Sequence, residues 1–545
     1  MVSESELRGA LRRYWGYDSF RPLQEKVVRS LMGGHDTCVV MPTGFGKSLC
    51  YQLPAAMLSD ETVIVVSPLI ALMQDQVTQL TQMGIPSALL NSSLSKPEQA
   101  KVIGGAKEGK YRLLYLSPER LAAADTADWL RRVPVSFFAI DEAHCISEWG
   151  HEFRPEYRQL NRLRAQFPDR RIAAFTASAT RQVRHDIIEQ LGLNDPHKYI
   201  ASFYRPNLRY FAIQCDEATQ RKHLLAALRH YSSQNVIIYA PTIAKVGATV
   251  ELLEANKIAA IPYHGRMDAE SRRENQERWM SDEVRVLVGT VAFGLGINKA
   301  AVRAVIHLAL PKSIEQYYQE AGRAGRDGLP ADCLLLWRKR DAGLLAYFIG
   351  LLTDEAEKQR GWQRYREIIR YAESNTCKHL QICTHFGEMP KWKSCAGCDA
   401  CGSELAWLPA APKVEEERAG ERAPHVPVEA QKKLPAPATL PAATVDPELR
   451  EYLRQWRRET AKKNEMAAFI IMHDTSLDEL CRVQPRTLAE LRRVSGFGER
   501  KTELYGKAIL EALERFRKGA RASELPPKTR VRKKRPWRES RQFAT

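Results

Sequence analysis

The sequence lacks the features that mark membrane, secreted and disulfide-rich proteins. Its longest mostly apolar stretch, residues 62–73, contains Ser67 and Pro68 and is shorter than the roughly 18 residues that cross a bilayer. The N-terminal residues include no apolar core of the kind found in a signal peptide. The 11 cysteines among 545 residues are too few for a disulfide scaffold. We therefore expect a cytoplasmic protein that does not bind membranes.

Acidic residues are too few to balance the basic ones. The chain has 82 Lys+Arg and 65 Asp+Glu, which gives a net charge of +17. Residues 515–545 hold 12 basic and 2 acidic residues, whereas residues 446–514 hold 13 of each. The 44% apolar and 27% charged content excludes a fibrous or wholly disordered chain. The positive excess favours a polyanionic partner, nucleic acid above all, and the C-terminal tail supplies more than half of it.

Short runs rich in Val, Ile and Leu recur through the first 340 residues and alternate with polar or helical stretches. Such runs are typical of strands that are buried on both faces of a parallel sheet and joined by helical crossovers. They fall into two series: 38–41, 63–66, 113–116, 137–140 and 172–175, then 236–239, 284–288, 305–308 and 333–337. The sequence therefore predicts an α/β protein with two parallel-sheet domains, over residues 1–203 and 204–340.

The remaining residues are of a different kind. A polar helical stretch with a cysteine cluster occupies residues 341–404. Residues 405–445 contain seven prolines and ten alanines but few large apolar side chains, which is typical of a flexible linker. Helical periodicity returns over residues 446–514 and predicts a small all-α domain. Residues 515–545 form a basic tail that we expect to be disordered, suited either to nonspecific phosphate binding or to no function.

A phosphate-binding loop follows the strand predicted at 38–41. Glycines allow such a loop to turn back, so that its amides and the next helix N-terminus face a phosphate. Met41 stands where the general pattern has its first glycine. Strand, loop and helix nevertheless follow in order, which disfavours a simple glycine turn with a surface lysine. Lys47 would face the β- and γ-phosphates of ATP, and Ser48 would bind Mg²⁺. The predicted nucleotide contacts in this loop are Thr43, Gly44, Gly46, Lys47 and Ser48.

Two further groups of charged residues are suited to phosphoryl transfer. Asp141 and Glu142 directly follow the strand predicted at 137–140. At such a strand end one carboxylate can hold Mg²⁺ while its neighbour orients and deprotonates the attacking water, and we assign Asp141 and Glu142 to these roles in that order. Arg323 and Arg326 lie among glycines in the second α/β half and are suited to reach across a cleft to a γ-phosphate. A basic helix start with satisfied arginines is the alternative for this pair.

Aromatic and basic residues are interleaved shortly after this carboxylate pair. Aromatic rings provide stacking surfaces for single-stranded bases, and Arg and His add positive charge. In isolation such a run more often belongs to a core, but its position after the predicted base favours a role in binding nucleic acid. The predicted contacts are Trp149, His151, Phe153, Arg154 and Tyr157.

Five of the 11 cysteines are crowded between residues 377 and 401. Four thiolates, three of them within seven residues, can wrap a tetrahedral Zn²⁺ and leave no open coordination position, so a structural zinc is expected. An iron–sulfur site is the rival. The four candidate ligands are Cys377, Cys395, Cys398 and Cys401. The neighbours that leave the identity of the first ligand open are His379, Cys383 and His385.

These motifs together resemble those of the RecQ family of DNA helicases, in helicase superfamily 2, over residues 7–402. The resemblance implies two RecA-like domains, a zinc-binding module with Cys377 as its first ligand and, over residues 446–514, an HRDC-like domain. It also implies an adenine-recognition motif in which Tyr17 stacks on the base while Arg21 and Gln24 contact the nucleotide. The implied activity is that of an ATP- and Mg²⁺-dependent DNA helicase that moves 3′→5′ on single-stranded DNA and separates forked duplexes in recombination and repair.

The chain departs from many members of that family after the zinc site. In those relatives a winged-helix domain follows and grips the duplex, whereas here the linker begins almost at once. One rival function is therefore a DNA-stimulated translocase that unwinds weakly. Others are a strand-annealing or scaffolding protein without catalysis and an RNA helicase, the last disfavoured by the matches over 10–30 and 145–157.

Two expectations concern the C-terminal domain and the assembly. The turn at 496–501 either presents amides and cations to a DNA phosphate or simply connects two helices. We expect a monomer, associated with the nucleoid if the source is bacterial. The sequence does not identify protein partners.

Overall fold

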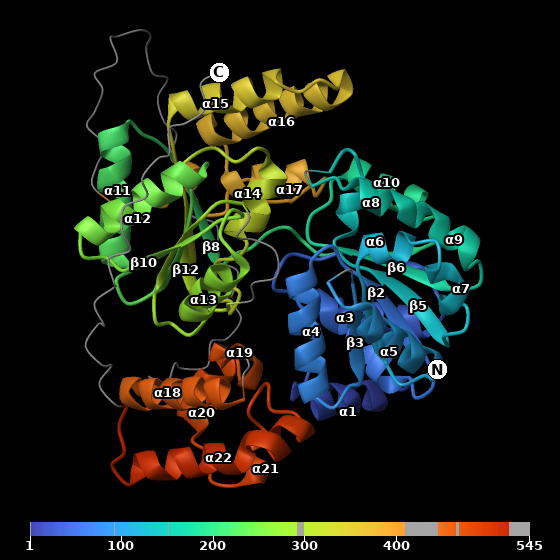
Figure 1. Cartoon of the computed structure of the whole chain (residues 1–545). Coiled ribbons are helices and arrows are strands. Elements are labelled where there is room, and N and C mark those ends of the chain that lie inside the picture. The colour runs from blue at the N-terminus through green and yellow to red at the C-terminus, as the bar shows by residue number, and fades with distance from the viewer. Residues whose placement is uncertain are drawn as a thin grey trace, which may run out of the picture.

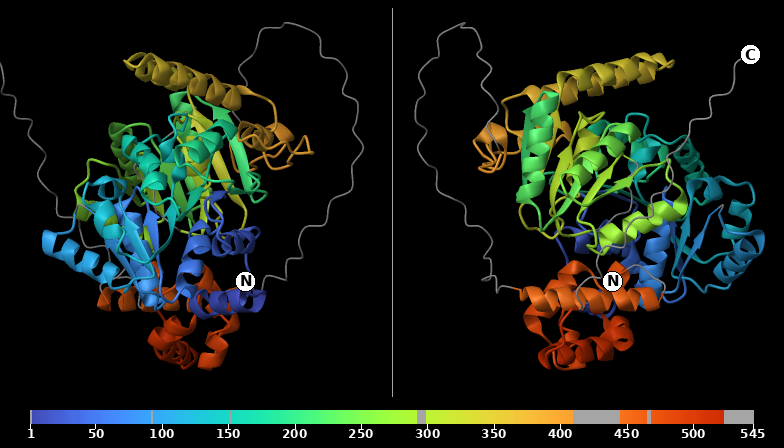
Figure 2. Two further views of the ribbon diagram at one scale, coloured as in Figure 1. Left: turned by 90° about the vertical axis from the view of Figure 1, so that its right-hand side faces the viewer. Right: turned by 60° about the vertical axis from the view of Figure 1, so that its left-hand side comes forward.

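The computed structural model describes residues 2–91, 93–150, 152–291, 299–408, 445–464 and 468–522. Within these ranges two separate parallel sheets, each with its own helices, make up most of the molecule (Figure 1). A pair of long helices projects from the second sheet's domain, and a small helical domain lies at the opposite end (Figures 1 and 2). No helix in the described ranges has the length and apolar character needed to cross a bilayer.

The first sheet has seven parallel strands in the order β3-β4-β2-β5-β6-β1-β7. Its inner strands are almost wholly buried because helical crossovers cover both faces. The strands are β1 (Thr37–Val40), β2 (Thr62–Val66), β3 (Ser87–Leu90), β4 (Leu113–Leu116), β5 (Val135–Ile140), β6 (Arg171–Thr176) and β7 (His197–Ile200). The longer helices are α1 (Glu4–Trp15), α2 (Gln24–Met32), α3 (Lys47–Met57), α4 (Ile70–Gln82), α5 (Lys96–Lys107) and α10 (Arg181–Gln190). The shorter helices are α6 (Pro118–Ala122), α7 (Thr126–Leu130), α8 (Pro155–Arg158) and α9 (Leu163–Gln166), with 3-10 turns η1 (Ala143–Ile146) and η2 (Gln159–Arg162).

The second sheet has six parallel strands in the order β10-β11-β9-β12-β13-β8. Its strands are β8 (Leu208–Gln214), β9 (Asn235–Tyr239), β10 (Ala260–Tyr263), β11 (Val286–Gly289), β12 (Val302–His307) and β13 (Ala331–Trp337). Its helices are α11 (Glu217–His230), α12 (Ile243–Ala255), α13 (Ala269–Met280) and α14 (Ile314–Ala321). The predicted class, with two RecA-like parallel-sheet domains, is confirmed.

The zinc-binding region follows the second sheet directly. It consists of the projecting pair α15 (Lys339–Gly350) and α16 (Glu355–Glu373), then α17 (Lys378–His385) and the turn η3 (Asp399–Cys401). Phe203, in the connection between the two sheets, stacks on Phe386 with ring centroids 4.3 Å apart. A single apolar core therefore continues from the first α/β domain through the second into the zinc-binding region.

The C-terminal helical domain lies against both α/β domains. Its helices are α18 (Pro447–Lys463), α19 (Ala468–Ile471), α20 (Asp474–Val483), α21 (Leu488–Leu491) and α22 (Glu499–Arg517). Figure 1 shows α19 between α13 of the second domain and α4 of the first, and α19 is in contact with both helices. The Arg454 guanidinium pairs with Asp282 of the second domain at 2.9 Å.

The turn at 496–501 serves this docking. A Cβ on Gly16 of the first domain would lie 2.7 Å from the Phe497 backbone, and one on Gly498 would lie 2.6 Å from the Arg13 carbonyl. The two main chains therefore approach more closely than side chains would allow. Lys501 is buried. The turn is packed against protein, which favours the connecting-turn alternative over the phosphate-binding one.

Candidate functional site

The phosphate loop joins the buried strand β1 to α3. Gly46, with φ of 77°, caps α3, and Lys47 and Ser48 are the first two residues of that helix. The Lys47 Nζ donates to the Met41 carbonyl at 3.2 Å, so the residue at the first-glycine position contributes its main chain. Burial lowers the pKa of Lys47, while Glu142 and Asp141 act in the opposite direction. This arrangement places one cation at the N-terminus of a helix, which is suited to polyphosphate.

The predicted adenine motif supports this loop. The Gln24 amide donates to the carbonyls of Phe45 at 2.9 Å and Gly46 at 3.2 Å, and its oxygen accepts from the Arg21 main chain at 2.8 Å. The Arg21 guanidinium donates to the Gly44 carbonyl. Tyr17 lies next to the docked Gly16 and is partly exposed. Arg21 and Gln24 thus brace the loop backbone, and Tyr17 remains accessible to a base.

The carboxylate pair follows β5, and β2 fixes its position. The Asp141 amide donates to the Val66 carbonyl at 2.8 Å. Burial, and then the charge of Glu142, raise the pKa of Asp141 to about 7, although Lys47 acts against them. A divalent cation would relieve both effects, because it compensates the buried negative charge. Asp141 is therefore chemically suited to hold Mg²⁺, and the Ser48 hydroxyl at the start of α3 stays the predicted second ligand.

His144 links the predicted base to the end of β6. Its Nδ1 lies 3.3 Å from the Glu142 carboxylate and 3.0 Å from the Thr176 hydroxyl. Thr176 also contacts the Ser178 carbonyl, and the Ser178 hydroxyl accepts from Gln319 of the second domain at 3.0 Å. A chain of buried polar contacts therefore runs from the carboxylate pair across the cleft.

The second domain brings its arginines to the same cleft. A Cβ on Gly44 would lie 3.2 Å from the Arg326 Cγ, so the Arg326 side chain lies directly against the phosphate loop. Burial, assisted by Arg323 and Arg205, lowers the pKa of Arg326 to about 9. Arg323 is buried. Of the two predicted arginines, Arg326 is thus seen in contact with the phosphate loop.

The aromatic-rich segment connects the carboxylates to the zinc-binding region. Trp149 is 49% exposed, and the Arg360 guanidinium of α16 lies 5.7 Å from its ring centroid. The Arg154 guanidinium donates to the Pro68 carbonyl at 3.4 Å, and Phe153 is half-buried. His151, which we predicted to bind DNA, lies outside the described residues.

Tyr157 requires a correction. Its side chain is 0% exposed, and its hydroxyl donates to the Asp141 carbonyl at 2.9 Å. A ring in this position cannot stack on a base. Tyr157 instead joins the aromatic-rich segment to the carboxylate pair, and the interleaved pattern alone did not distinguish this role from stacking.

The four predicted zinc ligands converge. The Sγ atoms of Cys377, Cys395, Cys398 and Cys401 all lie within 4.8 Å of one another. Main-chain amides of Lys378 and Gly397 donate to the sulfurs of Cys398 and Cys395 at 3.4 and 3.3 Å, as suits thiolates. Contact with Cys395 lowers the pKa of Cys398 to about 5 despite burial. The residues present fit a four-thiolate zinc site.

The geometry also bears on His379, Cys383 and His385, the three residues that could replace Cys377 as the first zinc ligand. His385 is 2.7 Å from Glu315, and Cys383 lies outside the four-sulfur group. His379 lies 3.1 Å from the Cys395 sulfur through Nδ1, while its Nε2 donates to the Arg205 carbonyl. Cys377 is thereby favoured as the first ligand.

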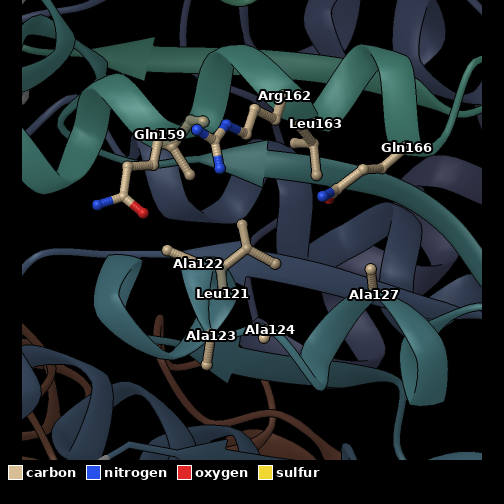
Figure 3. A pocket seen from close by; sticks show the side chains of 10 residues that line it. Leu121, Ala122, Ala123, Ala124, Ala127, Gln159, Arg162, Leu163 and Gln166 are labelled. Atoms are coloured by element: carbon tan, nitrogen blue, oxygen red, sulfur yellow. The ribbon is translucent and has the colours of Figure 1, made fainter.

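A separate pocket of about 190 Å³ lies in the first domain. Figure 3 shows Gln159, Arg162 and Gln166 on one side of it and Leu121 and its neighbouring alanines on the other. None of the residues that line it belongs to the phosphate loop or the carboxylate pair, and Arg162 is its one charged lining residue. It is therefore distinct from the nucleotide site.

Comparisons with known families cover most of the chain. A DEAD/DEAH box helicase model matches residues 21–186, and a helicase conserved C-terminal domain model matches residues 219–328. A RecQ zinc-binding model matches residues 339–402, and an HRDC domain model matches residues 446–513.

Curated relatives agree with these matches. An ATP-dependent DNA helicase RecQ from Pasteurella multocida is 33% identical over 602 aligned positions, which cover 95% of each chain. A protein of the same name from Haemophilus influenzae is 42% identical over 74% of this chain and 64% of its own, so this chain spans less than two thirds of that relative. A third, from Bacillus subtilis, is 38% identical over 72% of this chain and 66% of its own.

Solved structures resemble a large part of the chain. The DUF1998 helicase MrfA bound to DNA and AMPPNP matches with a TM-score of 0.52 and 20% identity over 62% of this chain and 50% of its own. Mss116p bound to single-stranded RNA and AMP-PNP matches with a TM-score of 0.53 and 15% identity over 71% of this chain and 88% of its own. At these identities the likeness concerns the fold alone.

Proposed function

Because this chain belongs to the RecQ family of DNA helicases, we propose that it is an ATP- and Mg²⁺-dependent DNA helicase. In this proposal it translocates 3′→5′ on single-stranded DNA and separates forked duplexes during recombination and repair. The observation that carries the proposal is the juxtaposition of Arg326 with Gly44, which brings both halves of a phosphoryl-transfer site to one cleft.

The residues divide the chemistry among them. Lys47 and the amides of the phosphate loop bind the β- and γ-phosphates, and Thr43, Gly44 and Gly46 allow the main chain to approach them. Ser48 and Asp141 would hold Mg²⁺, which would supply positive charge beside the phosphates. The remaining roles are orientation and deprotonation of water by Glu142, stabilisation of γ-phosphate charge by Arg323 and Arg326, and nucleotide binding by Tyr17, Arg21 and Gln24.

DNA binding reaches this site through the aromatic-rich segment. We infer that Trp149, Phe153 and Arg154 contact single strands, and Tyr157 of the same segment donates to the Asp141 carbonyl at 2.9 Å. A DNA base that displaces the loop around Trp149 would therefore move the aromatic-rich segment, which Tyr157 joins to the main chain of Asp141. This connection supports DNA-stimulated hydrolysis.

A DNA-stimulated translocase with weak unwinding is the second candidate. The zinc-binding match ends at residue 402 and the HRDC match begins at 446, which leaves no room for a winged-helix domain. The alignment with the Pasteurella relative spans 602 positions, more than the 545 residues of this chain, so that relative has segments without a counterpart here.

Two assays test the proposal. ATPase activity should rise with single-stranded DNA, rise much less with single-stranded RNA, and be abolished by Lys47→Ala while DNA binding through the basic tail persists. An ATP hydrolysis rate that does not rise when DNA is added would contradict the proposal. Strand separation should require a 3′ tail on a forked duplex. Separation only from a 5′ tail would reverse the polarity, and hydrolysis without separation would favour the translocase.

A further inference from the structure

Arg205 lies in the connection between β7 and β8, where the chain passes from the first domain to the second. It is 6% exposed, and its guanidinium faces main-chain carbonyls from both sides of the cleft. The contacts are with Thr43 at 3.5 Å, Gly322 at 3.5 Å, Ala324 at 3.2 Å and Gly325 at 3.1 Å. A planar guanidinium is suited to this task because its five N–H donors point in fixed directions.

The charge of Arg205 is balanced in an unusual way. In the part of the chain that the structure describes, its polar side-chain contacts are those four carbonyls and the Asn207 amide oxygen at 3.4 Å. A buried cation is ordinarily paired with a carboxylate. Here carbonyl dipoles replace the carboxylate, so the side chain acts as a brace between loops.

The two loops that Arg205 joins are the ones that carry the reactive groups. Thr43 directly precedes Gly44, and Gly322, Ala324 and Gly325 directly precede or flank the arginines of the second domain. Asn207 holds the same loop, because its amide donates to the Gly325 carbonyl at 2.8 Å. The loop bearing Arg326 is thus fixed to the phosphate loop by the inter-domain connection.

The zinc-binding region in turn fixes the main chain of Arg205. The Arg205 carbonyl accepts from the His379 Nε2 at 3.1 Å, and the Nδ1 of the same ring lies 3.1 Å from the Cys395 Sγ. The His379 ring is held edge-on to Tyr204 and Tyr210, with centroids 5.0 and 4.8 Å away. A buried histidine therefore spans from a zinc ligand to the connection.

We propose that Arg205 is a positioning residue for ATP hydrolysis, which holds the loop bearing Arg326 against the phosphate loop, and that His379 ties Arg205 to the zinc site. This inference rests on the proposed ATPase function. It gives the zinc-binding region a role in ATP hydrolysis, although this region is far from the phosphate loop in the sequence.

Arg205→Gln removes the brace and keeps a polar side chain. We expect kcat of the DNA-stimulated ATPase to fall about 10- to 100-fold, less than the roughly 1,000-fold or more expected for Arg326→Ala. Affinity for ADP should change by less than about twofold, since ADP has no γ-phosphate for Arg326 to meet. Arg205→Lys should not rescue kcat, because one ammonium cannot span both loops.

A double variant tests whether Arg205 acts through Arg326. Arg205→Gln combined with Arg326→Ala should be about as slow as Arg326→Ala alone. The matched control is Arg184→Gln, since Arg184 joins the first domain to the Phe386 carbonyl at 3.2 Å but touches neither loop. Its kcat should stay near that of the wild type.

The variant His379→Ala tests whether His379 ties Arg205 to the zinc site. We expect zinc content to stay near that of the wild type, because the four cysteines complete the site, while kcat falls. Loss of zinc in this variant would make His379 a zinc ligand and overturn the proposed tie.

Several results would overturn the inference. They are an unchanged kcat in Arg205→Gln, multiplicative effects in the double variant, or loss of zinc and of thermal stability in both Arg205→Gln and Arg205→Lys. If the wild type hydrolyses ATP and the Arg205 variants match it, this inference fails alone. If the wild type hydrolyses no ATP, the proposed function fails with it.

Discussion

The docking of the C-terminal domain depends on a buried ion cluster that can be tested directly. The Arg454 and Asp282 side chains are 6% and 1% exposed and lie 2.9 Å apart. Lys299 and Asn235 of the second domain also contact Asp282, at 2.7 and 2.8 Å. Burial alone would raise the pKa of Asp282, but Lys299 and Arg454 together hold it well below its ordinary value.

Replacing Arg454 with Met removes one partner and leaves Asp282 paired. A hydrogen bond to a charged group contributes about 1.5–3 kcal/mol, so the docked state should weaken by that amount. Asp282→Asn would take the carboxylate away from buried Lys299 and leave Arg454 with Glu451 at 3.4 Å as its partner, and should cost about 3–5 kcal/mol. Since the pKa of Asp282 is depressed, its contribution is present above the unfolded value near 4 and is lost only as the pH falls below it. Docking through this pair should therefore not change between pH 5 and 8.

Hydrogen exchange provides the assay. Amides of α1 and of the 496–501 turn, which face each other, should exchange roughly 10- to 100-fold faster in Arg454→Met. The control is Arg458→Met, since Arg458 lies on the same helix and pairs with Glu451 at 2.7 Å without reaching the second domain. Equal protection in the two variants would refute the assignment of docking energy to the buried pair.

Three further predictions concern single residues. Burial lowers the pKa of Lys501 to about 8, so Lys501→Met should stabilise the C-terminal domain by about 3 kcal/mol at pH 7. The gain should shrink as the pH rises from 8 towards 10.5, and a thermal melt with no gain at pH 7 would contradict it. Gly46→Ala should prevent ATP binding in a fluorescent-nucleotide titration, because φ is 77° and a Cβ would lie 2.5 Å from the Gln24 amide; normal affinity would mean that the loop relaxes easily. Cys398→Ser should lose zinc on metal analysis, and retained zinc would remove this residue from the ligand set.

Sequence patterns predicted the interior of each sheet better than its edges. All nine apolar runs correspond to strands, because a strand buried on both faces must be apolar at every position. The strands that the pattern missed are β3, β7, β8 and β10, and each lies at an edge of its sheet. Edge strands are less buried, and in β7 and β8 polar residues such as His197, Lys198 and Arg209 interrupt the apolar pattern. The other two, β3 and β10, are four residues long and contain Ser87 and Pro262, which weaken the strand signal.

The residues of the site also differ in how well the sequence predicts them. Residues that share a loop, such as Gly46 and Lys47, could be identified because their spacing is fixed within one chain segment. The brace formed by Arg205 and the bond from Tyr157 to Asp141 join segments far apart in the sequence. An isolated arginine or tyrosine carries no local signal for such a partner. Only the path of the chain in three dimensions brings these residues together.

The docked C-terminal domain touches the first domain through Gly16 and Gly498 and the second through Arg454 and Asp282. A body attached to two others at separate points shares their relative motion. A widening of the cleft that moves these two attachment points apart would loosen one of them. By reciprocity, a nucleotide that favours one cleft width also changes the docking equilibrium, and undocking changes nucleotide affinity by the same factor. Docking of the C-terminal domain and opening of the cleft are thereby coupled.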